Sequence, residues 1–334
     1  MATSSDEELI AAALASADDA GASPADRADM LVEIAMSLQQ RPKNAEQLRG
    51  AVDLYERAIA LCAPDDYVMI ARIRARLGTA LQAIPGEGYD DVLLACEAYE
   101  AAAKILRVGG EPEEVAELDL NLGLVLQTLA AAGRAQITDA IAAYQRALAV
   151  FEKHKFPQEY AILQNNLAAA FLSMPVTDER SKLREALAVQ SFEEGLRVVN
   201  IIDYPVEYAM LQNNLGNALQ YSSSSHRVEN TLRALEAYDE ALKVRTRATT
   251  PVEFANTIAN RANALANVPD DLERPEAGNP QNLALARAAY AQAREVFAEC
   301  GEFENVRIVS TAIAEIDTEL DSHGHAASLF HTGT

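Results

Sequence analysis

One segment recurs along this chain at a nearly constant interval, and this repetition restricts the possible folds more than any other feature. The clearest copies are PQEYAILQNNLAAAF from Pro157, PVEYAMLQNNLGNAL from Pro205 and PVEFANTIANRANAL from Pro251. Two weaker copies upstream contain ARLGTAL and LNLGLVL. Aligned, the copies share a column of residues spaced by 45, 45, 48 and 46 positions, which holds Arg76, Asn121, Asn166, Asn214 and Asn260. A fixed period in this range predicts an array of repeated units.

The spacing of apolar residues predicts that these units are helical. Met30, Ile34 and Leu38 fall on one stripe of a helix, and similar stripes continue to the end of the repeats. No stretch alternates with a period of two for long enough to indicate a strand. We therefore expect an all-α protein.

A second landmark lies between the recurring segments. A small residue is followed four positions later by an aromatic residue and three positions after that by another small residue. We expect the small residues to let the two helices of a hairpin approach closely, and the aromatic ring to fill the gap to the next hairpin. The aromatic positions number six and predict six hairpins: Tyr55, Tyr99, Tyr144, Phe192, Tyr238 and Tyr290.

This pattern of leucine, glycine, aromatic residue, alanine and closing proline resembles the tetratricopeptide repeat family. The resemblance implies a right-handed superhelical solenoid, although these units are longer than the family's usual length of about 34 residues. We expect a lead-in helix in 1–24, a capping helix in 303–322 and a disordered tail in 323–334. The predicted repeats are 25–62, 66–108, 112–154, 157–200, 205–247 and 251–300.

Charge and composition limit the partners. The net charge of −22 argues against a nucleic-acid partner, because binding a phosphate backbone needs a concentrated basic surface. The acidic exterior either keeps the protein soluble or attracts a basic partner. No stretch has the length and apolarity of a membrane span, and the start of the sequence lacks a signal-peptide pattern. Three cysteines without a CxxC pair favour reduced thiols. We expect a cytoplasmic protein.

No motif for catalysis or cofactor binding is present. The sequence contains no glycine-rich phosphate loop, no HExxH and no nucleophile elbow, so we expect neither an enzyme nor a cofactor. We assign no metal site. His323, His325 and His331 could hold a metal loosely, but the tail offers no fixed carboxylate or cysteine ligand beside them.

Asparagines gather on the first helices of the hairpins. In the family that this chain resembles, these helices line a concave groove, and the residue before the Leu-Gly pair points into it. An amide side chain offers a donor and an acceptor, so a row of amides can hold an extended peptide by its backbone. The same amides could instead bridge neighbouring helices, and both interpretations stay open. The candidate groove residues are Asn121, Asn165, Asn166, Asn213, Asn214, Asn217, Asn256, Asn260 and Asn263.

Two arginines extend this candidate groove toward the N-terminus. Arg72 and Arg76 lie four residues apart on one face of the first helix of the second hairpin. Their guanidinium groups could bind a partner's carboxylate or pair with the chain's own abundant carboxylates.

The sequence thus predicts a non-enzymatic scaffold or adaptor that binds an extended or basic segment of another protein. The alternative is an accessory factor for assembling a redox metalloenzyme such as a hydrogenase. It rests on a similarity of the sixth repeat, including the acidic loop 267–281, to accessory proteins encoded near such enzymes. The sequence fixes neither the partner nor the oligomeric state.

Overall fold

A computed structural model of the chain describes residues 10–12, 14–15, 21–86, 88–175, 180–223 and 226–331, without the side chains of 180 and 323–331. These residues are all-helical and contain no strand, which confirms the predicted fold class. The chain divides into two compact units, Met1–Glu152 and Lys153–Thr334. Most of the lead-in helix expected in 1–24 lies outside the described residues.

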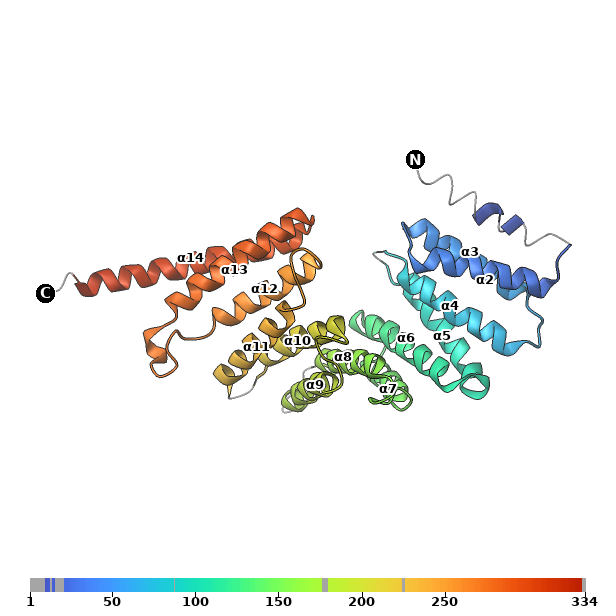
Figure 1. The fold of residues 1–334 in the computed structure, drawn as a ribbon, viewed down its shortest axis with the longest axis horizontal. Coiled ribbons are helices and arrows are strands. Elements are labelled where there is room, and N and C mark those ends of the chain that lie inside the picture. Colours follow the sequence, from blue (N-terminus) through green and yellow to red (C-terminus); the bar gives the residue numbers. More distant parts are fainter. Residues whose placement is uncertain are drawn as a thin grey trace. The chain divides into compact units, whose positions relative to one another are not determined.

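The first unit contains three helix hairpins (Figure 1). Within each hairpin the second helix packs back against the first. The helices are α2 (Pro24–Gln40), α3 (Ala45–Leu61), α4 (Tyr67–Ala83), α5 (Asp90–Gly109), α6 (Pro112–Ala131) and α7 (Ile137–Leu148).

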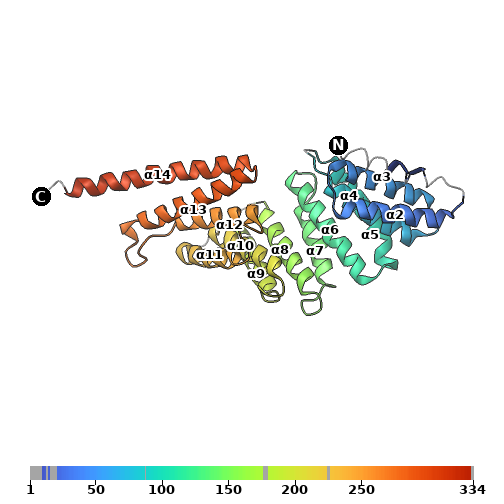
Figure 2. The same cartoon turned by 45° about the horizontal axis from the view of Figure 1, so that its top comes forward.

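The second unit contains three further hairpins and a terminal helix. Each pair again folds back on itself, and α14 packs against α13 (Figures 1 and 2). The elements are α8 (Pro157–Ser173), α9 (Arg180–Leu196), α10 (Pro205–Gln220), α11 (Arg227–Leu242), α12 (Pro251–Leu265), the 3-10 turn η1 (Pro275–Ala277), α13 (Pro280–Glu299) and α14 (Phe303–His331). The bounds given above for the individual repeats remain our proposal.

The helix ends follow from local chemistry. Pro157, Pro205 and Pro251 each begin a helix, where the missing N–H of proline has no intrahelical partner to lose. At the start of α3, the Asn44 side chain accepts a hydrogen bond from the Gln47 backbone N–H at 2.9 Å. Gly133 follows α6 with φ of 69°, a left-handed conformation that favours glycine.

The aromatic landmark packs inside its own hairpin. A Cβ on Gly123 of α6 would lie 2.4 Å from Cε1 of Tyr144 on α7, so the ring lies directly over the glycine backbone. Gly216 and Tyr238 repeat this contact between α10 and α11, where the distance would be 2.6 Å. The rings therefore contact the first helix of their own hairpin, a contact that the prediction did not include. The glycine is needed because the ring occupies the space of its side chain.

The buried tyrosine hydroxyls are satisfied by glutamines of the same hairpin. In four hairpins the phenol donates a hydrogen bond to a glutamine Oε1 on the first helix, at 2.8 to 3.0 Å. In the fourth hairpin Phe192 takes the place of the tyrosine, and Leu172 stands where the glutamine would be. In the sixth hairpin Tyr290 keeps the hydroxyl, but Ala266 stands in the glutamine column. The hydrogen-bonded pairs are Tyr55–Gln39, Tyr99–Gln82, Tyr144–Gln127 and Tyr238–Gln220.

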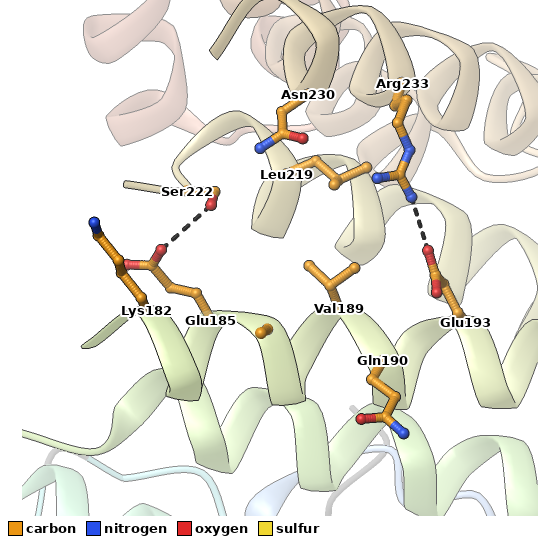
Figure 3. Close-up of a pocket in the computed structure, with 10 residues that line it drawn as sticks. Lys182, Glu185, Val189, Gln190, Glu193, Leu219, Ser222, Asn230 and Arg233 are labelled. Atoms are coloured by element: carbon orange, nitrogen blue, oxygen red, sulfur yellow. Dashed lines mark hydrogen bonds and ion pairs between the residues drawn. The ribbon is translucent and has the colours of Figure 1, made fainter. Parts of the chain in front are cut away.

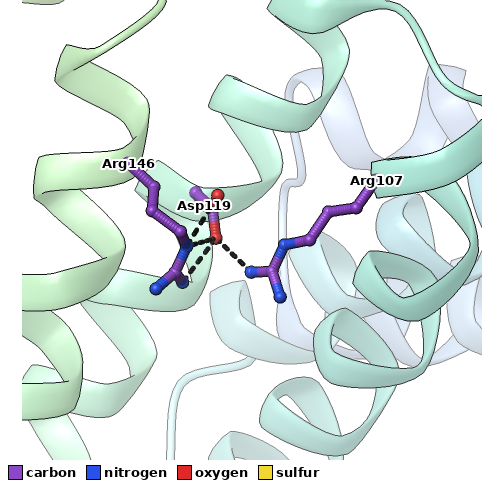
Figure 4. Close-up of polar contacts among 3 residues, drawn as sticks. All are labelled: Arg107, Asp119 and Arg146. Carbon is purple, nitrogen blue, oxygen red and sulfur yellow. Dashed lines mark hydrogen bonds and ion pairs between the residues drawn. The ribbon is translucent and has the colours of Figure 1, made fainter.

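A buried carboxylate links the second and third hairpins. Asp119 of α6, whose side chain is 3% exposed, accepts hydrogen bonds from Arg107 of α5 at 2.6 Å and from Arg146 of α7 at 2.7 Å (Figure 4). Two cations thus compensate the cost of burying one anion. This triad fixes three helices of the first unit against one another.

The C-terminal part has a longer terminal helix than the sequence predicts and an ordered loop before α13. Helix α14 continues to His331, so the backbone of 323–331 is helical where we expected a disordered tail, and residues 332–334 lie outside the described part. The loop 267–281 folds back on itself. Its Asp270 carboxylate accepts the backbone N–H groups of Gln281 and Asn282, both at 2.8 Å, at the N-terminus of α13. The loop therefore caps a helix from a distance.

None of the helices in the described part of the chain has the length and apolarity needed to cross a membrane.

Candidate functional site

Side-chain amides connect the first helices of the three hairpins in the second unit. Asn214 of α10 donates from Nδ2 to Oδ1 of Asn165 on α8 at 2.8 Å. Within α8, Asn165 donates to Asn166 at 3.2 Å, and within α10, Asn213 donates to Asn214 at 3.1 Å. The amides of two helices therefore form one hydrogen-bonded chain.

The chain of amides continues onto α12. Asn260 donates from Nδ2 to Oδ1 of Asn213 at 3.3 Å, and the Thr257 hydroxyl lies 3.1 Å from the same oxygen. Arg245, in the segment between α11 and α12, donates to the Thr257 hydroxyl at 2.9 Å. Burial lowers the pKa of the Arg245 guanidinium. The network thus ends at a partly buried cation.

Burial divides these asparagines into two groups. Asn165 and Asn213 are 8% and 7% exposed, and their amides accept the hydrogen bonds that Asn214 and Asn260 donate from the first helix of the next hairpin. Asn166, Asn214 and Asn260 are half-buried and lie at the edge of the network. We call these three side chains the amide face. Among the described residues, Nδ2 of Asn166 and Oδ1 of Asn260 have no hydrogen-bond partner.

The remaining predicted asparagines of this unit lie outside the chain of hydrogen-bonded amides. Oδ1 of Asn217 lies 2.7 Å from the Tyr238 hydroxyl and shares its single proton with Gln220, and Asn263 donates to the Tyr221 hydroxyl at 2.8 Å. These two therefore serve contacts between helices. Asn256 is exposed, and its side chain makes no hydrogen bond within the described structure.

The three predicted residues of the first unit line one pocket of about 240 Å³ between α4, α5 and α6. Arg72 binds both oxygens of Glu114, at 2.7 and 3.2 Å, and this contact holds the pKa of the Glu114 carboxyl below its usual value. The partner of Arg72 is therefore the chain's own carboxylate. Arg76 contacts the Met36 sulfur, and the Asn121 amide has no hydrogen-bond partner among the described residues.

Thr257 and Arg245 belong to the network but were not predicted. The column of Thr257 holds an apolar residue in the four preceding first helices, ending with Leu211. The column of Arg245 is likewise apolar elsewhere, as at Phe151 and Val199. A polar residue in each of these two otherwise apolar columns could have drawn attention to Thr257 and Arg245. The sequence alone does not show that these two side chains contact each other.

No group of three or more His, Cys, Asp and Glu side chains in the described structure is placed to hold a metal ion. The side chains of His323, His325 and His331 lie outside the described residues, so the expectation that they form no metal site stays a prediction.

No protein-family model and no curated protein matches the chain. Solved structures do resemble it. The pilF protein of Pseudomonas aeruginosa matches with a TM-score of 0.51 at 15% identity, over 83% of this chain and 96% of its own. BtubC (BKLC) from P. vanneervenii matches with a TM-score of 0.50 at 17% identity, over 81% of this chain and 92% of its own. The fold is a tetratricopeptide-like helical repeat. The Rap conjugation gene regulator of plasmid pLS20, in complex with the Phr* peptide, matches with a TM-score of 0.48 at 15% identity, over 86% of this chain and 74% of its own.

Proposed function

We propose that the chain is a non-enzymatic adaptor that binds an extended segment of another protein on the amide face of α8, α10 and α12. The observation that supports this is the backing of that face. Each half-buried amide is held by a buried neighbour, as Asn214 is by Asn165 and Asn260 by Asn213. Side chains fixed before binding lose less conformational entropy when a ligand arrives.

The polar atoms of the amide face that lack a hydrogen-bond partner among the described residues can pair with a peptide backbone. Nδ2 of Asn166 is a donor for a peptide C=O, and Oδ1 of Asn260 is an acceptor for a peptide N–H. Asn214 uses both its atoms within the network, but its carbonyl oxygen keeps a second lone pair. Backbone recognition of this kind gives affinity without requiring one particular sequence.

The first unit offers a separate surface with similar chemistry. Asn121 lines the same pocket as Arg76, which forms no ion pair with a described residue. We propose that this pocket takes a peptide group together with an acidic side chain or a terminal carboxylate.

Selection from a random peptide library, followed by calorimetric titration, tests this function. We expect Asn166→Ala and Asn260→Ala each to weaken binding of a selected peptide by up to about tenfold, the upper range for one lost hydrogen bond. Asn305→Ala on α14 is the matched control, because its amide binds only Glu302 of the same helix end. Equal affinity of all three variants would count against the amide face.

No contact in the described structure favours the alternative, an accessory factor of a redox metalloenzyme. The loop 267–281, on which that similarity partly rests, is used to cap α13.

A further inference from the structure

A second groove lies on another side of α4, away from the pocket of Arg72 and Arg76. It has a volume of about 710 Å³ and is enclosed by α3, α4 and α5. Its lining includes Leu77 and Leu81 from α4, Ile84 directly after α4, Val52 and Ile59 from α3, and Leu94 from α5. Leu94 is 50% exposed, which leaves a large apolar side chain open to solvent at the rim.

The second unit has an equivalent groove that serves as an internal comparison. It measures about 500 Å³ and lies between α9, α10 and α11 (Figure 3). Arg233 there takes the place of Leu94, because each lies five residues before the buried tyrosine of its helix. Arg233 reaches across the groove to Glu193 on α9, at 2.7 Å (Figure 3). An ion pair thus lies beside Val189 and Leu219 in this groove, whereas the α3–α4–α5 groove has the apolar Leu94 at the position of Arg233.

The charges around the α3–α4–α5 groove are mainly acidic. Arg49 and Asp91 pair with each other at 3.4 Å. Of the remaining lining residues, Asp53, Glu56 and Glu97 carry carboxylates that form no ion pair with any described residue. Arg74 is the other cation of the lining, so the unpaired charge is negative in sum.

The chain's own terminal segments do not match this surface. The N-terminal sequence SSDEEL and the segment AEIDTELD of α14 are both acidic. Repulsion between like charges would oppose binding of either segment in the groove, whether the segment came from the same chain or from a second copy. The occupant that fits is therefore a basic segment of a different protein.

We propose that the α3–α4–α5 groove docks a basic amphipathic helix of a partner protein. The lining residues of α3 run from Arg49 to Ile59, which is roughly 15 Å of helix, or about three turns of a bound helix. Apolar residues at i, i+3, i+4 and i+7 would enter between Leu94 and Leu77. Lysines or arginines beside them would pair with Glu56 and Glu97 across the rim.

Fluorescence anisotropy with a defined probe tests the proposal on the full chain. The probe is a labelled peptide of about 14 residues, near the minimum for an isolated helix, with leucines at helical spacing and lysines elsewhere. A second peptide carries glutamates in place of the lysines. We expect the lysine peptide to bind and the glutamate peptide to bind at least about tenfold more weakly.

Two sets of variants locate the binding. Leu94→Arg copies Arg233 of the second unit and should weaken the lysine peptide about tenfold or more. Val108→Arg makes the same chemical change at a residue that is 91% exposed on α5 and away from the groove, and should leave affinity within about twofold. If Leu94→Arg does not fold, the double variant Glu56→Gln with Glu97→Gln replaces it. This variant removes two carboxylates of the groove and should also weaken binding of the lysine peptide. Equal binding to the groove variants and to Val108→Arg, or equal binding of both peptides, overturns the proposal.

Discussion

Gly123 and Tyr144 touch so closely that no side-chain carbon fits between them, since a Cβ on the glycine would lie 2.4 Å from the tyrosine ring. The same relation holds for Gly78 with Tyr99, where the distance would be 2.8 Å. A buried aromatic ring thus sets how closely the two helices of a hairpin pack.

We predict that Gly123→Ala destabilises the protein by about 1–3 kcal/mol, because the methyl group must displace a fully buried ring. Gly86→Ala is the control, since a Cβ at that loop position meets nothing within 4 Å. It should be neutral or slightly stabilising. Denaturant unfolding of both variants checks this, and a Gly123→Ala protein as stable as the parent would refute the contact.

The Tyr144–Gln127 pair should show strong coupling. Gln127→Leu alone leaves a buried hydroxyl without its acceptor and should cost about 1–3 kcal/mol. Adding Tyr144→Phe removes that hydroxyl and copies the Phe192 and Leu172 of the fourth hairpin, so the double variant should regain most of the loss. A double-mutant cycle measures this. Additive losses would mean that the hydrogen bond does not form.

Asp119 should stabilise the first unit through its two arginines. Asp119→Ala leaves Arg107 and Arg146 without their shared anion. Both arginine side chains are more than 40% exposed and can rehydrate, so we expect a loss of about 1–3 kcal/mol. Arg233→Ala, which breaks an exposed pair, should cost about 0–1 kcal/mol. Thermal unfolding of the two variants compares them, and equal losses would show that burial of Asp119 adds nothing.

Stability should fall in alkali because the tyrosines are buried. Burial raises the pKa of the Tyr99 phenol to about 12, and burial also raises that of Tyr55 to about 12, although Arg76 opposes it. A folded pKa above the unfolded value of about 10 gives stability that is complete below pH 10 and is lost as the pH rises toward 12.

Urea unfolding at about pH 9 and pH 11 measures this loss. Tyr99→Phe should show a smaller fall between the two pH values than the parent, because it removes one of the titrating groups. If the free energy of unfolding fell by the same amount in both proteins, titration of Tyr99 would not be a cause of the loss.

Much of the fold could be predicted from the sequence because its signals are local. Proline at the start of α8, α10 and α12 and the recurring tyrosine needed no knowledge of distant residues. The packing of the tyrosine ring was less accessible, since glycine and ring are about 20 residues apart and their contact depends on how the hairpin closes.

The candidate site was harder to predict, because its contacts join residues far apart in the sequence. Asn165 and Asn214 are 49 residues apart, and only the packing of α8 beside α10 shows that they meet. Likewise, Arg72 and Glu114 are 42 residues apart, and only the packed helices show that they meet. Column alignment identifies equivalent positions but not which neighbour each one faces.

Backbone methylation of a selected peptide tests the central claim most directly, because the amide face is proposed to hold the peptide's own N–H and C=O groups. Titration would compare the unmodified peptide with versions methylated at one backbone nitrogen at a time. We predict that at least one methylation in the bound stretch weakens binding by about tenfold or more in the parent protein and by about twofold or less in Asn260→Ala, which has already lost the acceptor. Unchanged affinity for every methylated peptide would contradict backbone recognition by these asparagines.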